Sequence, residues 1–347
     1  MECVGCLGVH LASDVPRLLG LTPAVVRRLI RDGVLVRVRQ GVLAGKCTVA
    51  RAAEDANIAH LLAVQGQLLN YAEAYASHES AAIAHGLPLL ALPTAPLLTR
   101  PSGAWRGGDA GRIRIAPLPE HHRVVVQGIR ATSLPRTFVD IARSSSLAAA
   151  VIVGDYVRRW RCTQEELEAM LAECSAWSDV GKARQALAFL DPRSESPLES
   201  VSRVYMHEFD LPAPQLQALV RGASGSVYRA DFYWEFAQLV GEADGMGKYG
   251  KTPEEIAAAL RAEKMREDDI RDGGCGVVRW ELRADARADG GDNGPDRPPP
   301  RPPLIFANVC ADRRDTPWPP AISRRSVWDR TEGQIPGGQP KNLTLGS

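Results

Sequence analysis

The sequence predicts an α+β protein built of several domains, and three observations support this fold class. A chain of 347 residues is long for a single domain. The spacing of apolar residues switches several times between helical and strand periods. Proline and glycine dominate near the C-terminus. We expect a winged helix-turn-helix, an α/β middle domain, a mixed α/β domain and a disordered Pro/Gly-rich tail, at 1–49, 50–193, 194–283 and 284–347.

Charge and composition narrow the possible partners and the compartment. The net charge is only +1, so a nucleic-acid surface would have to be a local patch. Seven scattered cysteines do not form a disulfide framework and favour reduced thiols. The longest apolar run, LAAAVIV at 147–153, is too short to cross a bilayer, and the N-terminus is a poor signal peptide. We therefore expect a cytoplasmic protein without a membrane partner.

The first segment, residues 11–46, has the pattern of a winged helix. Thr22 supplies a capping oxygen and Pro23 takes the first position of a helix that Gly33 ends. The following LVRVRQGVLA alternates at period two around a Gln-Gly turn, which predicts a hairpin. Helix, turn, helix and small hairpin is the order of elements in a winged helix-turn-helix.

Basic residues gather in this first segment. Residues 1–50 carry seven Lys/Arg and three Asp/Glu. The predicted second helix buries its apolar side and leaves arginines on the other, which suits the DNA phosphate backbone and major groove. The alternative is a solvated arginine face on a protein-interaction module. The candidate DNA contacts are Arg27, Arg28, Arg31, Arg37 and Arg39.

The middle region, residues 50–193, alternates helical and strand patterns. Residues 54–86 are rich in Ala and Leu and predict helices, whereas GRIRIAPL and HRVVVQGIRATSL predict strands. Thr163 and Glu166 have the spacing of a capping box. His121-His122 is expected on an exposed loop. We find no catalytic constellation here.

The third region combines an amphipathic helix, strands and a second helix. SESPLESVSRVYMHEF predicts the first helix, and LPAPQLQALV a turn and a strand. YRADFYWEFAQLVGEADGMGKY predicts a hairpin, followed by the helix TPEEIAAALRAEKMREDDIRDGG and the strand CGVVRWEL. This order predicts a mixed sheet packed with helices.

The hairpin places two acids in an unusual position. If its turn centres between residues 236 and 237, Asp231 lies opposite Glu242, with Cβ atoms about 4.5–5.5 Å apart on one face. Two carboxylates that close repel, so one pKa should rise unless a cation bridges them. Mg²⁺ or Mn²⁺ suits such a pair and could activate a water for attack on a phosphate. The alternative is a pair of ordinary exposed acids.

Three further residues complete this candidate site. Asp244 shares the face of Glu242 if the strand continues that far. Lys248 could hold the attacking water or the phosphate. Glu199, on the preceding helix, could extend the acidic cluster. We therefore expect catalytic roles for Asp231, Glu242, Lys248 and Glu199.

Residues 194–280 resemble the very-short-patch-repair-endonuclease-like branch of the PD-(D/E)xK nuclease superfamily, which has a restriction-endonuclease-like fold. The similar blocks are SESPLES, LPAPQLQ, YRADFYW, GEADGMGKY, AEKMREDDIRDGG and VVRW, over about a quarter of the chain. The resemblance implies that Asp231 and Glu242 bind the metal with Glu199. It also implies a role for Lys248 in the site and for Lys264 or Arg266 at its edge.

One departure from the superfamily pattern concerns the lysine usually found two residues after the second acid. Here that position holds Asp244, and Lys248 is the substitute that we expect. A second departure is the Pro-rich tail, where the superfamily would continue with a helix.

Residues 11–140 resemble AbiEi-type antitoxin proteins. The similar motifs are RQGVLAG, ASHESAAIAHGLP and SLPRTFVDIAR. This resemblance implies sequence-specific promoter binding and partnership with a toxin protein, and it supplies no catalytic residues. The leading expectation is therefore a DNA-binding protein with a metal-dependent endonuclease domain. The alternatives are a non-enzymatic transcriptional regulator or antitoxin, and a protein-interaction module.

Overall fold

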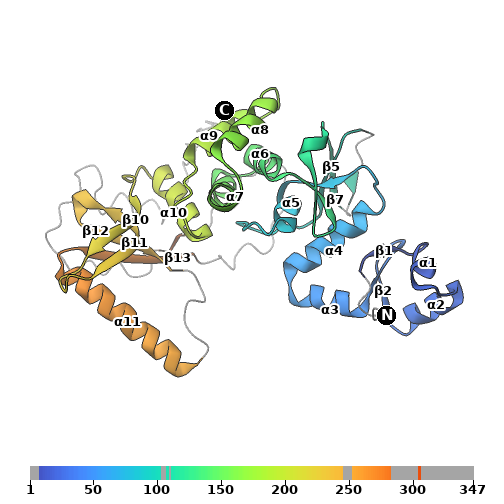
Figure 1. Cartoon of the computed structure of the whole chain (residues 1–347), viewed down its shortest axis with the longest axis horizontal. Helices are drawn as coiled ribbons and strands as arrows, with labels where there is room; N and C mark the ends of the chain where they lie inside the picture. The colour runs from blue at the N-terminus through green and yellow to red at the C-terminus, as the bar shows by residue number, and fades with distance from the viewer. Residues whose placement is uncertain (1–7, 103–106, 109–110, 245–251, 283–303, 306–347) are drawn as a thin grey trace, which may run out of the picture. The chain divides into compact units, whose positions relative to one another are not determined.

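The computed structural model of the chain divides into two compact units, Met1–Val201 and Ser202–Ser347 (Figure 1). Strands form three sheets among the described residues, and helices accompany each of them. The fold is therefore of mixed α/β type. The structure describes residues 8–102, 107–108, 111–244, 252–282 and 304–305.

The first unit begins with two short helices and a small antiparallel sheet of strand order β1-β3-β2. Thr22 Oγ1 accepts a hydrogen bond from the Val25 N–H at 3.4 Å, which confirms the predicted helix start. Val15, Val26 and Leu43 are buried between the helices and the sheet. The elements are β1 (His10–Leu11), α1 (Val15–Leu19), α2 (Pro23–Arg31), β2 (Leu35–Arg39) and β3 (Val42–Gly45).

A mixed six-stranded sheet of order β6-β7-β5-β4-β9-β8 follows in the same unit. Its apolar side packs on residues of α4 and α5, with Val64, Ala81 and Leu98 fully buried. The strands are β4 (Tyr75–Ala76), β5 (Leu97–Arg100), β6 (Gly107–Gly108), β7 (Gly111–Ile115), β8 (Arg123–Val126) and β9 (Ile129–Thr132). The helices before and between them are α3 (Lys46–Glu54), α4 (Ala56–Leu68), α5 (His78–Ala84) and the 3-10 helix η2 (Glu120–His122).

Four helices then form a bundle with its own core: α6 (Leu134–Ser144), α7 (Leu147–Trp160), α8 (Gln164–Glu173) and α9 (Val180–Phe189). Thr163 and Glu166 form the reciprocal capping box at the start of α8, which confirms that prediction. Gly154 lies where a Cβ atom would collide with the side chains of Leu190 and Phe138, so a larger residue here would force these side chains to move.

The second unit contains one mixed sheet of order β10-β11-β12-β13-β14. Strands β12 and β13 are parallel, and the other neighbours are antiparallel. The C-terminal end of helix α11 lies against the sheet (Figure 1), and its Ile270 joins a core with Val240 and Val277. The elements are α10 (Pro197–Glu208), which begins in the first unit, β10 (Gln215–Arg221), β11 (Val227–Trp234), β12 (Leu239–Ala243), α11 (Pro253–Asp272), β13 (Gly276–Leu282) and β14 (Leu304–Ile305).

Strand β14 lies within the tail that was expected to be disordered. Leu304 and Ile305 pair with Leu282 and Glu281 of β13. Ile305 is β-branched, and such residues favour strands. The remainder of 284–347 lies outside the described residues. None of the helices in the described part of the chain is both long and apolar enough to span a membrane.

Candidate functional site

The hairpin of β11 and β12 places Asp231 and Glu242 opposite one another. The paired residues are Phe232 with Gly241, Tyr233 with Val240 and Trp234 with Leu239, and one further step in this register joins Asp231 to Glu242. The turn is a 3-10 helix, η3 (Glu235–Ala237). The alternation and the turn therefore produce the register that the sequence predicted.

Asp231 lies where the ladder between the two strands ends. One of its carboxylate oxygens, Oδ2, accepts a hydrogen bond from the Ala243 N–H at 2.9 Å. The carboxylate thus reaches across to β12 and satisfies a backbone donor beyond the last residue pair. This contact fixes Asp231 beside the strand that carries Glu242.

Glu242 is the more buried of the two acids, with 9% of its side chain exposed. Its Oε1 receives a hydrogen bond from Arg266 of α11 at 2.8 Å, and the same guanidinium nitrogen donates to the Arg229 carbonyl at 2.6 Å. Burial raises the pKa of Glu242 above its usual range, Arg266 opposes this rise, and the nearby Asp231 carboxylate adds to it. The acid pair is therefore close enough for the charge of Asp231 to affect Glu242.

Asp244 also has an arginine beside it. Arg279 Nη1 lies 3.4 Å from Asp244 Oδ2, and the same side chain contacts Glu263 and Glu267 of α11. Arg279 is the neighbour of Glu242 in the parallel register of β12 and β13. The superfamily pattern has a lysine at the position of Asp244. In this chain the positive charge beside that position comes instead from Arg279 of β13.

Two further residues were expected to complete this site, Glu199 and Lys248. Glu199 belongs to the first unit, where its carboxylate accepts bonds from the Glu195 N–H at 2.9 Å and the Ser196 hydroxyl at 2.8 Å at the start of α10. Lys248 lies outside the described residues. Of the two candidates at the edge, Arg266 contacts Glu242, whereas Lys264 is exposed. The roles of Glu199 and Lys248 stay predictions.

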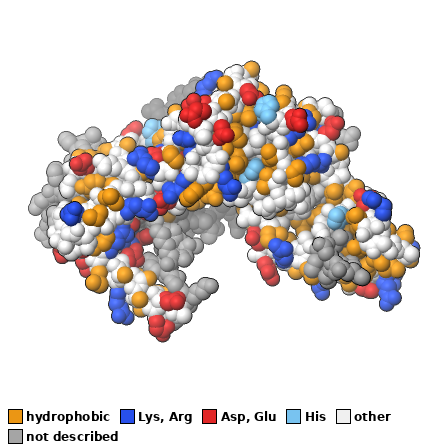
Figure 2. All heavy atoms as spheres, viewed as in Figure 1, with side chains coloured by type: hydrophobic (Ala, Val, Ile, Leu, Met, Phe, Trp, Pro, Cys, Tyr) orange, Lys and Arg blue, Asp and Glu red, His pale blue; other side chains and the backbone are white. Residues whose placement is uncertain are grey.

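The arginines of the first segment are mostly available to solvent. Arg27, Arg28 and Arg31 of α2 and Arg37 of β2 are exposed, and Figure 2 shows basic side chains at the surface of this lobe. Arg28 also lies 3.4 Å from Asp32, one helical turn on. Arg39 differs, because it is only partly exposed and its aliphatic stem packs against Gly66 of α4.

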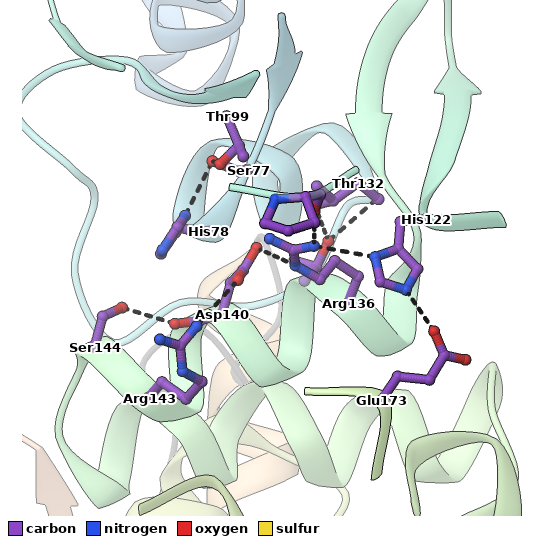
Figure 3. Close-up of polar contacts among 12 residues, drawn as sticks. Ser77, His78, Thr99, His122, Thr132, Arg136, Asp140, Arg143, Ser144 and Glu173 are labelled. Carbon is purple, nitrogen blue, oxygen red and sulfur yellow. Dashed lines mark hydrogen bonds and ion pairs between the residues drawn. The ribbon is translucent and has the colours of Figure 1, made fainter. Parts of the chain in front are cut away.

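A buried polar network that the sequence did not indicate lies between the sheet and the helical bundle of the first unit (Figure 3). Arg136, only 1% exposed, donates to Asp140 at 3.0 Å and to the Pro117 carbonyl at 2.9 Å. The guanidinium groups of Arg136 and Arg143 both stack on Trp177. The available signal was an arginine four residues before an aspartate on an otherwise apolar helix, LPRTFVDIAR.

The network extends to a pair of histidines. The Nε2 atoms of His121 and His122 lie 2.8 and 3.1 Å from Glu173 Oε2, and the three groups have the proximity of metal ligands (Figure 3 shows His122 and Glu173). Arg136 donates to His122 Nδ1 at 3.0 Å. Because arginine can only donate, the proton of neutral His122 lies on Nε2, which then donates to Glu173 and has no lone pair for a metal.

The burial of His122 corrects one expectation. It was predicted on an exposed loop, but it is 2% exposed on η2 and contacts both α6 and α8. Sequence alone offered no sign of this, because its partners lie 14 and 51 residues away along the chain.

Comparison with known proteins gives limited similarity. No family model matches the chain. "Uncharacterized protein Rv2248" and "Uncharacterized protein MT2308" of Mycobacterium tuberculosis are each 32% identical over 143 residues, or 41% of this chain. The chain spans about half, 53%, of the length of these relatives.

A solved structure, "Crystal structure of RV2827C protein from Mycobacterium tuberculosis", aligns with 74% of this chain and 90% of its own. The sequence identity is 15% and the TM-score is 0.33, too low to establish a common fold.

Proposed function

We propose that the protein binds DNA and hydrolyses its phosphodiester bonds with a divalent cation, Mg²⁺ or Mn²⁺, held by Asp231 and Glu242. The observation that supports this proposal is the facing pair of carboxylates at the end of the β11–β12 ladder, one of them buried with a raised pKa. Paired carboxylates of shifted pKa are typical of functional sites. The resemblance of residues 194–280 to PD-(D/E)xK nucleases agrees with this chemistry.

The two carboxylates fit a hard cation, because Mg²⁺ and Mn²⁺ prefer oxygen ligands and commonly use one or two carboxylates with water and phosphate. When bound, such an ion would lower the pKa of a water and stabilise the charge developing on the phosphate. Arg266 neutralises Glu242 in this structure. With a cation at the acids, the guanidinium of Arg266 would be available to contact a DNA phosphate.

DNA binding is assigned to the first segment, which we propose acts as a winged helix. Helix α2 would present Arg27, Arg28 and Arg31, and the β2–β3 hairpin would present Arg37, with a smaller contribution from the partly buried Arg39. Exposed arginines on a short helix and an adjacent hairpin suit the phosphate backbone and the edges of the major groove.

DNA cleavage with purified full-length protein tests the nuclease proposal. We expect cleavage in Mg²⁺ or Mn²⁺ that is lost in Asp231→Ala and Glu242→Ala, and retained in Glu235→Ala. Glu235 is the matched control, because it is an exposed acid in the turn of the same hairpin. Cleavage by Asp231→Ala and Glu242→Ala at the native rate would remove this assignment.

A second candidate function is a non-enzymatic transcriptional regulator, an antitoxin with a toxin protein as its partner. The observation that favours it is that Arg266 and Arg279 already lie against the acids of the second unit. A domain whose acidic charges are balanced by its own arginines needs no metal ion to balance them, which suits a non-enzymatic scaffold. This function predicts a specific operator and no cleavage with any divalent cation.

DNA affinity measured at several salt concentrations tests the arginine assignment that both functions share. We expect Arg28→Ala combined with Arg31→Ala to weaken binding and to reduce the slope of log affinity against log salt by about two. Arg51→Ala, an exposed arginine of α3, is the control. An unchanged slope in the double variant would leave the protein-interaction module as the better account.

A further inference from the structure

His78 is held in an unusual backbone conformation at the start of α5. Its φ is +52°, in the left-handed region that is uncommon for residues other than glycine, although histidine, asparagine and aspartate adopt it more often than most. The side chain is also 3% exposed, so a polar ring is enclosed among other groups. Strain of this kind persists only where the surrounding structure determines it, and it is common at ligand-binding positions.

A chain of hydrogen bonds fixes the proton on the His78 ring. Thr99 Oγ1 donates to Ser77 Oγ at 2.8 Å, and Ser77 Oγ lies 2.9 Å from His78 Nδ1. Ser77 is fully buried, and among the described residues His78 Nδ1 is the acceptor left for its single hydroxyl proton. Ser77 therefore donates to Nδ1, and the neutral ring carries its own proton on Nε2. His78 thus presents an N–H donor on the side away from Ser77.

The surroundings of this donor are rich in positive charge. Arg114 of β7 is the register partner of Thr99 in β5, which places it beside the Thr99–Ser77–His78 chain. Arg136 and Arg143 approach from α6, and Figure 3 shows the His78 ring directed toward the part of α6 that carries Asp140 and Arg143. Burial, followed by the charge of Arg114, lowers the pKa of His78 to about 3 and keeps the ring neutral.

The nearby acids already have partners. Asp140 accepts from Arg136 at 3.0 Å, and Glu79 accepts from the Ser145 hydroxyl at 2.8 Å. Arg143 is held by the Ser178 carbonyl at 2.6 Å. Within the described parts of the chain, Arg114 is exposed and makes no hydrogen bond through its side chain, although its charge also acts on Asp140. The group thus combines a free guanidinium at the surface with an inward N–H donor.

We propose that Arg114 and His78 form a binding site for a phosphate-type oxyanion. The guanidinium of Arg114 would hold two oxygens from the solvent side, and His78 Nε2–H would donate to a third. This site is separate from the acids of the second unit and does not depend on the proposed nuclease function.

Calorimetric titration of the full-length protein with inorganic phosphate and with sulfate, at constant ionic strength, tests this site. We expect Arg114→Gln to bind either anion at least tenfold more weakly than the native protein. Arg114 is exposed, so this variant should fold. Arg51→Gln is the control and should bind as the native protein does. Equal affinity in Arg114→Gln, or no binding of either anion to the native protein, would overturn the proposal.

A second variant and a second ligand sharpen the test. His78→Asn removes the inward donor but keeps a residue that tolerates positive φ, and it should weaken anion binding as Arg114→Gln does. Because His78 stays neutral, sulfate affinity should be constant between about pH 5.5 and 8. A steep loss of sulfate binding as pH rises through this range would contradict the neutral donor. Tighter binding of ribose 5-phosphate than of free phosphate would identify an organic phosphate as the ligand, and equal binding the free anion.

Discussion

At the scale of single residues, Asp231 and Glu242 lie on the same hairpin but differ in burial and in hydrogen-bond partners. Asp231 is half-buried and is tied to a backbone N–H, whereas Glu242 is buried and depends on the guanidinium of Arg266. A buried carboxylate without a cation is strongly destabilising, so Glu242 is the residue whose charge the fold must manage.

The dependence of Glu242 on Arg266 gives a prediction about stability. We expect Arg266→Gln to lower the free energy of unfolding by about 1.5–3 kcal/mol, the usual contribution of a hydrogen bond to a charged group. The measurement is urea denaturation at neutral pH, with Arg261→Gln as the control because it is an exposed arginine of the same helix. If Mg²⁺ binds the acids, millimolar Mg²⁺ should recover part of the loss.

The same residue has a predictable pH dependence. The folded pKa of Glu242 lies above its unfolded value, so the folded state binds more protons between the two values. Its contribution to stability is therefore full below the usual glutamate pKa and is lost as pH rises through the folded pKa. Comparison of unfolding free energies from about pH 4 to 7 should show this loss in the native protein and not in Glu242→Gln. Parallel curves for the two proteins would show that Glu242 is not shifted.

At the scale of secondary structure, helices α2 and α6 carry the same sequence device in different surroundings. Each has an arginine followed four residues later by an aspartate, Arg28–Asp32 at the surface and Arg136–Asp140 in the interior. The exposed pair has 77% and 49% of its side chains open to water, and the buried pair 1% and 2%. The same spacing therefore contributes little to stability in the exposed pair, whereas loss of one partner from the buried pair is costly.

This pair of helices supplies its own control for a stability prediction. We expect Asp140→Ala to lower the free energy of unfolding by about 3–5 kcal/mol, because it leaves the buried Arg136 charge without its partner. Asp32→Ala should change it by less than about 0.5 kcal/mol. Chemical denaturation of both variants measures the difference. A small effect of Asp140→Ala would mean that Pro117, His122 and Trp177 satisfy Arg136 without the aspartate.

At the scale of the whole molecule, the first unit contains several histidines that burial keeps neutral. Burial is the largest cause of the lowered pKa values of His60, His78, His85 and His122. Each of them binds a proton more readily in the unfolded chain, so their contribution to stability is present above about pH 6.5 and is lost as pH falls. The first unit should therefore weaken on mild acidification.

A variant of one histidine tests this behaviour. The loss of unfolding free energy between about pH 7.5 and 5.5 should be smaller in His122→Gln than in the native protein. His121→Gln is the neighbouring control, because His121 is exposed. An equal loss in His122→Gln and the native protein would show that His122 does not contribute to the acid sensitivity.

Several local features of the fold were predictable because they depend on near neighbours in sequence. Thr22 and Pro23 mark the start of α2, Thr163 and Glu166 cap α8, and the alternation around residues 236 and 237 sets the hairpin register. Caps and two-residue periods are short-range, so sequence alone can specify them. The predicted functional roles and domain limits depend on contacts between distant residues, and the proposed experiments test the functional roles.

With a turn centred between residues 236 and 237, the sequence by itself determined that Asp231 and Glu242 face each other, because side chains alternate with a period of two along each strand. Only the tertiary structure decided which cations accompany the acids: Arg266 lies 24 residues beyond Glu242, and Arg279 lies 35 residues beyond Asp244. The positions of Arg266 and Arg279 depend on how α11 and β13 pack, and the periodicity of a short segment does not predict that packing. The burial of His122 and the surroundings of His78 depend in the same way on contacts between distant segments.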